Sequence, residues 1–412
     1  MVQRDLQAIP GGALAAQGFR GASVRAGIKV KPVADMALLV SDEPCTAAGT
    51  FTRNRFRAAP VRVCEEHLGD GRAQAIIANS GNANCATGAQ GLANARRMAE
   101  LVGQALGLRP ADVLVCSTGA IGHQLPMAKI EAAVPKLVAG LGRGDPEGLA
   151  RAIMTTDTRP KMHAVAFDLD GREVRVGGVA KGAGMIAPNM ATMLSFVTTD
   201  VAAEPAFLRD ALRWAVERSF NCISVDGCMS TNDTVLLLAN GASGACITSP
   251  VGHGAESFRR ALLEVCRELA KMIAGDGEGA TKLISIRVTG GRSFLEARRV
   301  ARAVADYTLL KIAIHGQQFN WGRLVAAIGA SMAAVAPETV TAAIGGLKVW
   351  QRGEPVHVAA SDAAAALSGR EVVLDIDLGQ GQAEAEAWTC DISEEFIAEN
   401  VAYEGPVEEE VW

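Results

Sequence analysis

The fold of this chain is decided by the stretch Lys181-Gly-Ala-Gly-Met-Ile-Ala-Pro-Asn-Met-Ala-Thr192-Met-Leu-Ser-Phe-Val-Thr-Thr-Asp200, in which a glycine-rich turn leads into an apolar strand. Glycines let backbone approach backbone closely, and Pro188 fixes its own φ and restricts Ala187 before it. A strained peptide bond can be held at such a junction. Thr192 is therefore a candidate reactive residue, although a threonine at the start of a strand is usually a β-branched packing residue.

The chemistry of Thr192 follows from its own two functional groups. If its hydroxyl attacks the carbonyl of Ala191, an N-to-O shift gives an ester, and hydrolysis of the ester leaves Thr192 as a new N-terminus. A free α-amine titrates near ~8, so it can take the proton of the neighbouring hydroxyl without a His or Asp relay. The sequence thus predicts a cut between Ala191 and Thr192 that creates a nucleophile and its base.

Other small and polar stretches are candidates for the rest of a site. Residues 113–122 form an apolar run that ends in Ser117-Thr-Gly-Ala-Ile-Gly122. A turn there can present a hydroxyl and an amide to a tetrahedral oxyanion, or it can be a plain strand-to-helix turn. Three polar clusters can cap helices and turns, or line a pocket for an amino acid; they are residues 155–158, 230–234 and 275–281.

The composition of the 412-residue chain argues against several partners. The formal net charge is −5 with both signs interspersed, so nucleic acid is not an expected partner. The N-terminus has no charged segment before an apolar one, and no apolar run approaches ~18 residues, so we expect a cytoplasmic protein and no membrane anchor. Nine cysteines without a Cys-x-x-Cys pair predict reduced, mostly buried thiols and no metal site, with Cys222 and Cys228 as small packing residues.

Hydrophobic periodicity indicates the elements. A helical period predicts amphipathic helices over residues 92–105 and 262–273, and alternation predicts strands over residues 284–288 and 374–378. Because helices and strands mix without regular alternation, a layered α+β architecture is expected. Glycine-rich composition predicts two surface connections, over residues 140–148 and 243–254.

Taken together, these stretches resemble the ornithine acetyltransferase family, also called bifunctional glutamate N-acetyltransferase, of arginine biosynthesis. The resemblance covers nearly the whole chain and rests on residues 40–44, 51–55, 79–84, 117–119, 152–158, 181–192, 230–241, 276–282 and 320–323. It implies a layered αββα sandwich with a smaller C-terminal α/β part. It also implies self-cleavage into an α chain, residues 1–191, and a β chain, residues 192–412, assembled as an α2β2 heterotetramer.

The resemblance further implies a ping-pong reaction without metal or organic cofactor. Thr192 takes the acetyl group from N-acetylornithine and passes it to glutamate. Motif positions place the oxyanion hole at Thr118 and Gly119. They place substrate contacts at Thr155, Lys181, Thr192, Glu278 and Asn400. Lys181 can pair with a substrate carboxylate, and Glu278 supplies the negative charge that an ornithine ammonium requires.

Three places depart from the family's pattern. Cys228 replaces an acidic residue, Gln318 and Phe319 replace Asp-Pro, and Gly405 stands where a C-terminal threonine is common. The departures leave open a paralogue with another amino-acid donor or acceptor. Further alternatives are an amidase that uses water as acceptor and an uncleaved protein without activity, and acetyl-CoA stays open as a donor.

Overall fold

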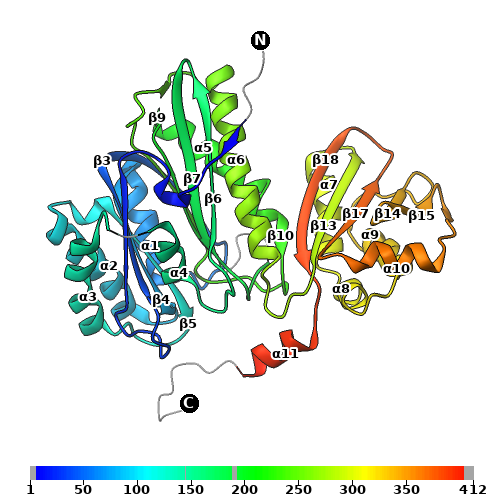
Figure 1. Cartoon of the computed structure of the whole chain (residues 1–412), viewed down its shortest axis with the longest axis horizontal. Helices are drawn as coiled ribbons and strands as arrows, with labels where there is room; N and C mark the ends of the chain where they lie inside the picture. The colour runs from blue at the N-terminus through cyan, green and yellow to red at the C-terminus, as the bar shows by residue number, and fades with distance from the viewer. Residues whose placement is uncertain (1–5, 144, 188–192, 403–412) are drawn as a thin grey trace.

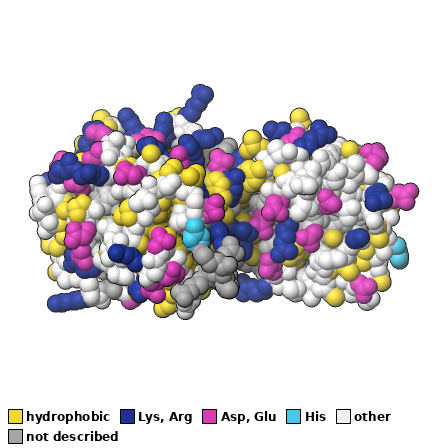
Figure 2. All heavy atoms as spheres, turned by 90° about the horizontal axis from the view of Figure 1, so that it is seen from above, with side chains coloured by type: hydrophobic (Ala, Val, Ile, Leu, Met, Phe, Trp, Pro, Cys, Tyr) yellow, Lys and Arg dark blue, Asp and Glu magenta, His cyan; other side chains and the backbone are white. Residues whose placement is uncertain are grey.

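The computed structural model describes residues 6–143, 145–187 and 193–402 of the chain. The described residues form two lobes, each built around its own sheet (Figure 1). Figure 2 shows acidic and basic side chains interspersed over both lobes, as the sequence predicts. Within the described ranges, no helix combines the length and apolar character that a membrane span requires.

The larger lobe contains a nine-stranded sheet in the order β1-β6-β7-β8-β11-β3-β4-β5, with β2 paired to β3. Its strands are β1 (Gln7–Ala8), β2 (Phe19–Val24), β3 (Met36–Phe51), β4 (Arg72–Asn82), β5 (Val113–Ala120), β6 (Lys161–Leu169), β7 (Arg172–Lys181), β8 (Leu194–Thr199) and β11 (Thr234–Ala239). The long strand β3 joins two layers. Its first half pairs with β2, its second half pairs with β11, and its register against β4 shifts between Val40 and Cys45.

Helices cover both sides of these layers. On one side, α1 (Ala59–His67) and α2 (Gly88–Leu106) contact β5, and α3 (Met127–Gly140) contacts β2. On the other side, α5 (Pro205–Glu217) contacts β3, and α6 (His253–Ala274) contacts β6 and β7. The predicted αββα sandwich is confirmed.

The two predicted helices lie where the periodicity placed them. In α2 the side chains of Ala95, Met98 and Val102 are fully buried, because a spacing of three to four residues aligns them on one face. The helix ends before Gly107, whose φ of 72° lies in the left-handed region that glycine adopts without strain. In α6 the predicted apolar face is likewise buried, and the helix ends before Gly275.

The smaller lobe is the predicted C-terminal α/β part and has a separate core. Its seven strands are β10 (Ile223–Ser224), β13 (Leu283–Gly291), β14 (Thr341–Ile344), β15 (Leu347–Gln351), β16 (Glu354–Pro355), β17 (Glu371–Asp377) and β18 (Ala383–Cys390). Its helices are α7 (Phe294–Ala305), α8 (Thr308–His315), α9 (Trp321–Gly329), α10 (Ala360–Ser368) and α11 (Glu394–Val401). The predicted strands at residues 284–288 and 374–378 correspond to β13 and β17.

Several local predictions are wrong. Residues 140–148 are not all loop, because Asp145 accepts a hydrogen bond from the Gly148 N–H and starts α4 (Pro146–Ile153). Residues 243–254 contain β12 (Cys246–Ile247), which pairs with β9 (Ala202–Ala203), and the first turn of α6. Strand β5 continues through the expected turn as far as Ala120.

The cysteines follow the prediction with one exception. All nine are free thiols, and seven are buried. Cys222 packs in the core, but Cys228 is exposed, so the expectation that both are packing residues is wrong for Cys228. Burial raises the pKa of the Cys222 thiol to about 12, which keeps it protonated.

The central strands of the larger sheet place the segments before and after the predicted cut next to each other. Strand β8 lies between β7 and β11, with Lys181 opposite Leu194 and Leu194 opposite Thr234. Strand β11 in turn pairs with β3. Strands β8 and β11, which follow Thr192 in the sequence, therefore lie between β7 and β3, which precede it, and residues 181, 194 and 234 lie at the same edge.

Candidate active site

A pocket opens at this edge of the sheet. It is lined mainly by small and polar side chains from strand ends and loops, namely Ala83, Thr118, Gly119, Ile121, Thr155, Thr156, Lys181, Gly184, Met185, Ser230, Thr231, Asn232, Glu278 and Asn400. All three polar clusters found in the sequence contribute to it. The structure thus brings together every described residue of the predicted site.

Thr118 and Gly119 lie at the end of β5, beside the parallel strand β4. A Cβ atom at Gly119 would lie 2.3 Å from the carbonyl carbon of Gly81, and the Gly119 φ of 134° also favours glycine. Only glycine therefore lets the two strand ends approach this closely. Thr118 is buried, and both Thr118 and Gly119 line the pocket.

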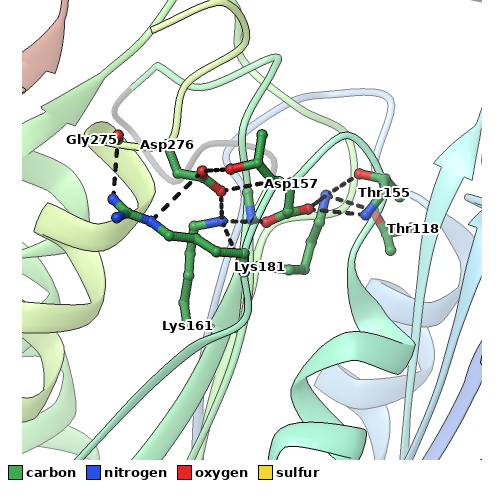
Figure 3. Close-up of polar contacts among 10 residues, drawn as sticks. Thr118, Thr155, Asp157, Lys161, Lys181, Gly275 and Asp276 are labelled. Carbon is green, nitrogen blue, oxygen red and sulfur yellow. Dashed lines mark hydrogen bonds and ion pairs between the residues drawn. The ribbon is translucent and has the colours of Figure 1, made fainter. Parts of the chain in front are cut away.

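Lys181 is the buried cation of the pocket (Figure 3). Its Nζ donates hydrogen bonds to Thr155 Oγ1 at 2.7 Å and to Thr118 Oγ1 at 3.4 Å. The nearest carboxylate oxygen, Oδ2 of Asp157, is 3.8 Å away. Burial lowers the pKa of Lys181, and the charge of Asp157 opposes this effect.

Asp157 orders the loop that carries Thr155. Its carboxylate accepts hydrogen bonds from the backbone N–H of Thr155 at 2.9 Å and of Gly182 at 2.6 Å. Burial by itself would raise the pKa of Asp157, but Lys181 and Lys161 outweigh it and hold the pKa well below its usual range. This carboxylate is therefore ionised at neutral pH.

Glu278 and Asn400 form the opposite wall. Glu278 follows α6, and its Oε2 accepts a hydrogen bond from Asn400 Nδ2 at 2.9 Å. A Cβ atom at Gly184 would meet the Glu278 carboxylate, so a side chain there would displace that carboxylate from its present position. Helix α11 carries Asn400 back from the smaller lobe toward the larger one, and Ser393 Oγ fixes its start by donating to the Gly279 carbonyl at 2.6 Å.

Ala191 and Thr192 lie outside the described residues, and the description resumes at Met193. The Met193 N–H donates to Asp233 Oδ1 at 3.0 Å, and its carbonyl accepts from the Thr234 N–H at 3.1 Å. Burial raises the pKa of Asp233 well above its ordinary value. The residue after Thr192 is therefore fixed at the same edge as the pocket.

Asn232 is a supporting residue whose role the sequence did not predict. Its Nδ2 donates to the carbonyl of Ala83 at 2.6 Å and to that of Ser117 at 2.9 Å. These two bonds tie the loop before β11 to strand β5 and to the residue after β4. The polar cluster at residues 230–234 and the motif at residues 230–241 both contain Asn232, but neither indicates which groups it binds.

Comparisons with known proteins identify the family of this chain. The model of the ArgJ family matches residues 20–405. A curated relative, the arginine biosynthesis bifunctional protein ArgJ of Symbiobacterium thermophilum, is 47% identical over 397 residues, which cover 96% of this chain and 99% of the relative. The chain belongs to the ArgJ family.

Solved structures of ArgJ proteins are similar to parts of the chain. Bifunctional ArgJ from Bacillus halodurans is 40% identical, with a TM-score of 0.50, and the match covers 52% of this chain and 100% of that one. Ornithine acetyltransferase from Mycobacterium tuberculosis, complexed with ornithine, is 41% identical, with a TM-score of 0.42, and the match covers 45% and 98% respectively.

The described residues that depart from the family's pattern, Cys228, Gln318 and Phe319, do not line the pocket. The Cys228 N–H donates to Asp226 Oδ1 at 2.8 Å, and Cys228 precedes the pocket residue Ser230 by two positions. Phe319 packs against the separate core of the smaller lobe. Gly405 lies outside the described residues.

The folding stability of this ArgJ family member should depend on pH through a histidine that contacts helix α11. His315 Nδ1 lies 2.8 Å from Asp391 Oδ2, and Nε2 lies 3.2 Å from Glu394 Oε2 in the first turn of α11. The hydrogen bond to Asp391 raises the pKa of His315. The protonated imidazole therefore stabilises the fold fully below its unfolded pKa of about 6.5, and this contribution disappears as pH rises through the raised pKa.

We expect the variant His315→Gln to show this dependence. Its melting temperature should fall below that of the unmodified protein at about pH 6, and the difference should shrink by about pH 8.5. Circular dichroism at the two pH values measures it. A difference that is the same at both would contradict the role of imidazole protonation.

Proposed function

We propose that this chain is the ornithine acetyltransferase of arginine biosynthesis and moves an acetyl group from N2-acetylornithine to glutamate through Thr192. Ornithine acetyltransferase activity follows from membership of the ArgJ family at 47% identity over nearly the whole chain. The observation that supports the proposed site is the convergence of Thr118, Gly119, Lys181 and Glu278 on one pocket at the sheet edge where β8 begins.

In the proposed first half-reaction, Thr192 is already an N-terminal residue. Its α-amine takes the hydroxyl proton as Oγ attacks the acetyl carbonyl carbon of the donor. Negative charge develops on the carbonyl oxygen, where the Thr118 hydroxyl and Gly119 amide donate hydrogen bonds. The C–N bond of the donor then breaks, the proton moves from the Thr192 amine to the departing nitrogen, and ornithine leaves an acetyl ester on Thr192.

In the second half-reaction, the amine of glutamate attacks the ester carbon. The same donors stabilise the second oxyanion, and the Thr192 amine accepts the proton that the attacking nitrogen loses. This proton returns to Thr192 Oγ as the C–O bond breaks. N-acetylglutamate and the starting enzyme result, so neither half-reaction consumes another reagent.

Charges in the pocket match the two charged ends of the donor. We assign the ammonium of Lys181 to the substrate carboxylate, because charge-assisted hydrogen bonds to carboxylates are among the strongest in proteins. Glu278, oriented by Asn400, is assigned to the side-chain ammonium of the donor. Thr155, which is hydrogen-bonded to Lys181, contributes a further hydroxyl to the substrate site.

The proposal includes the processing of the chain. A cut at Ala191–Thr192 gives an α chain of residues 1–191 and a β chain of residues 192–412, and both contribute to the pocket. The proposed assembly is an α2β2 heterotetramer, and the proposed place of action is the cytoplasm. Lys181 and Thr118 come from the α chain, whereas Glu278 and Asn400 come from the β chain.

An intact-mass measurement tests the processing and the first half-reaction together. We expect two fragments divided at Ala191–Thr192, and one acetyl group on the fragment that begins at Thr192 after brief mixing with N-acetylornithine. Two fragments without an adduct would contradict the donor, and would direct the search to other acylated amino acids. A single uncut chain would remove the basis for Thr192 as nucleophile.

A further inference from the structure

Behind the pocket lies a second buried lysine, which the proposed reaction does not use. Lys161 is 1% exposed and belongs to β6, beside the strand that carries Lys181. Its Nζ lies 2.7 Å from Asp157 Oδ1 and 2.5 Å from Asp276 Oδ2. Figure 3 shows the two carboxylates on either side of the Lys161 ammonium, with Lys181 beyond Asp157.

The two carboxylates belong to different segments that reach the pocket, Asp157 to the loop of Thr155 and Asp276 to the loop of Glu278. Asp157 binds the N–H groups of Thr155 and Gly182, the residues beside the Lys181 ammonium. Asp276 precedes Glu278 by two residues. It accepts a hydrogen bond from the Thr158 N–H at 3.1 Å and another from the Thr158 hydroxyl. One buried ammonium therefore links the wall of Lys181 to the loop of Glu278.

We propose that Lys161 is a positioning residue for substrate recognition: it fixes the separation of Lys181 and Glu278 by binding Asp157 and Asp276 together. The inference rests on the proposed function, in which Lys181 and Glu278 meet the two charged ends of an amino-acid substrate. Lys161 touches no substrate itself, since it does not line the pocket.

The charges around Lys181 give this role a measurable signature. The charged groups that act on Lys181 are Asp157, Lys161, Glu278, Asp233 and Lys29. Lys161 lowers the pKa of Lys181 by charge repulsion, so its removal raises that pKa. Removal also leaves Asp157 with one lysine partner. The present 3.8 Å separation can then close toward the ~2.8 Å of a charge-assisted hydrogen bond, away from Thr118 and Thr155.

The variant Lys161→Met tests both consequences in the full-length protein. We expect KM for N-acetylornithine to rise about tenfold, because the Lys181 contact is lost in the ground state as well as the transition state. We also expect the alkaline limb of kcat/KM to move to higher pH, because the pKa of Lys181 rises when the charge of Lys161 is removed. A purely structural role for Lys161 would not move this limb.

A second variant distinguishes loss of substrate positioning from loss of folding. Lys161→Met leaves an unbalanced buried carboxylate, whereas the double variant Lys161→Met/Asp276→Asn removes one charge of each sign. Its alkaline limb should shift in the same direction. Lys282→Met is the matched control, because Lys282 is also buried, but the partners of its ammonium within the described part of the chain are the carbonyls of Leu367 and Gly369.

The possible outcomes separate the inference from the proposed function. If the unmodified protein transfers no acetyl group from N-acetylornithine, the proposed function fails. If it does, and either variant keeps the original KM and alkaline limb, the role of Lys161 is overturned. Loss of folding in the charge-balanced double variant would also overturn it, because Lys161 would then serve the stability of the whole lobe.

Discussion

Replacing Thr192 with alanine is expected to leave one uncut chain with no acetyl transfer. The variant lacks the hydroxyl that would attack the Ala191 carbonyl, so no new N-terminus forms. It also lacks the nucleophile that would carry the acetyl group, and activity should fall by at least about a thousandfold. Electrophoresis of the purified protein and an assay of ornithine release measure the two effects.

Thr192→Ser is the matched control for this prediction. Serine keeps the hydroxyl and the α-amine, so the variant should still be cut and acetylated, although at altered rates. An alanine variant that appears as two fragments would show that the bond is cut without the Thr192 hydroxyl. An uncut alanine variant with full acetyl transfer would contradict Thr192 as the nucleophile.

The second large effect is expected for Thr118→Val, which keeps the shape of the side chain and removes its hydroxyl. Loss of one oxyanion donor lowers kcat by about 10²–10³. The Gly119 amide remains, so some activity should remain as well. Steady-state kinetics with N-acetylornithine and glutamate measure kcat and KM separately.

Thr118→Ser restores the donor and should recover most of kcat. A change in KM alone in the valine variant would contradict the oxyanion role, because a donor that acts on the transition state affects kcat. Such a result would instead connect Thr118 to substrate binding through its contact with Lys181. Intact mass should confirm that the valine variant is still cut.

Helices and strands whose buried residues recur at a regular spacing were predictable from the sequence. The apolar positions of α2 and α6, and the alternation in β13 and β17, mark faces that the fold buries. The start of α4 was missed because Pro146 and Gly148 are common in loops, although Asp145 followed by Pro146 is a typical N-cap and first helical residue. Likewise, the continuation of β5 past Thr118 depends on its neighbour β4.

The candidate site likewise contains residues that the sequence predicted and contacts that it did not predict. Residues carried by the family motifs converge on one pocket, and their roles remain predictions. The sequence did not indicate which groups the supporting residues bind. Lys161 and Asp276 are separated by 115 positions in sequence, and no local pattern pairs them. Asn232 stood in a polar cluster that could equally have formed a turn, and only the fold shows which carbonyls it binds.

The position of β8 and β11 between β7 and β3 has a consequence for the kinetics of folding. Because β8 lies between β7 and β11, and β11 pairs with β3, a cut between residues 191 and 192 separates the covalent chain but not the sheet. Before the cut, folding is a first-order process within one molecule. After denaturation of the cut protein, two polypeptides must meet to rebuild the same sheet, so recovery becomes second order and depends on concentration. After self-cleavage, the protein could therefore no longer refold as a single chain.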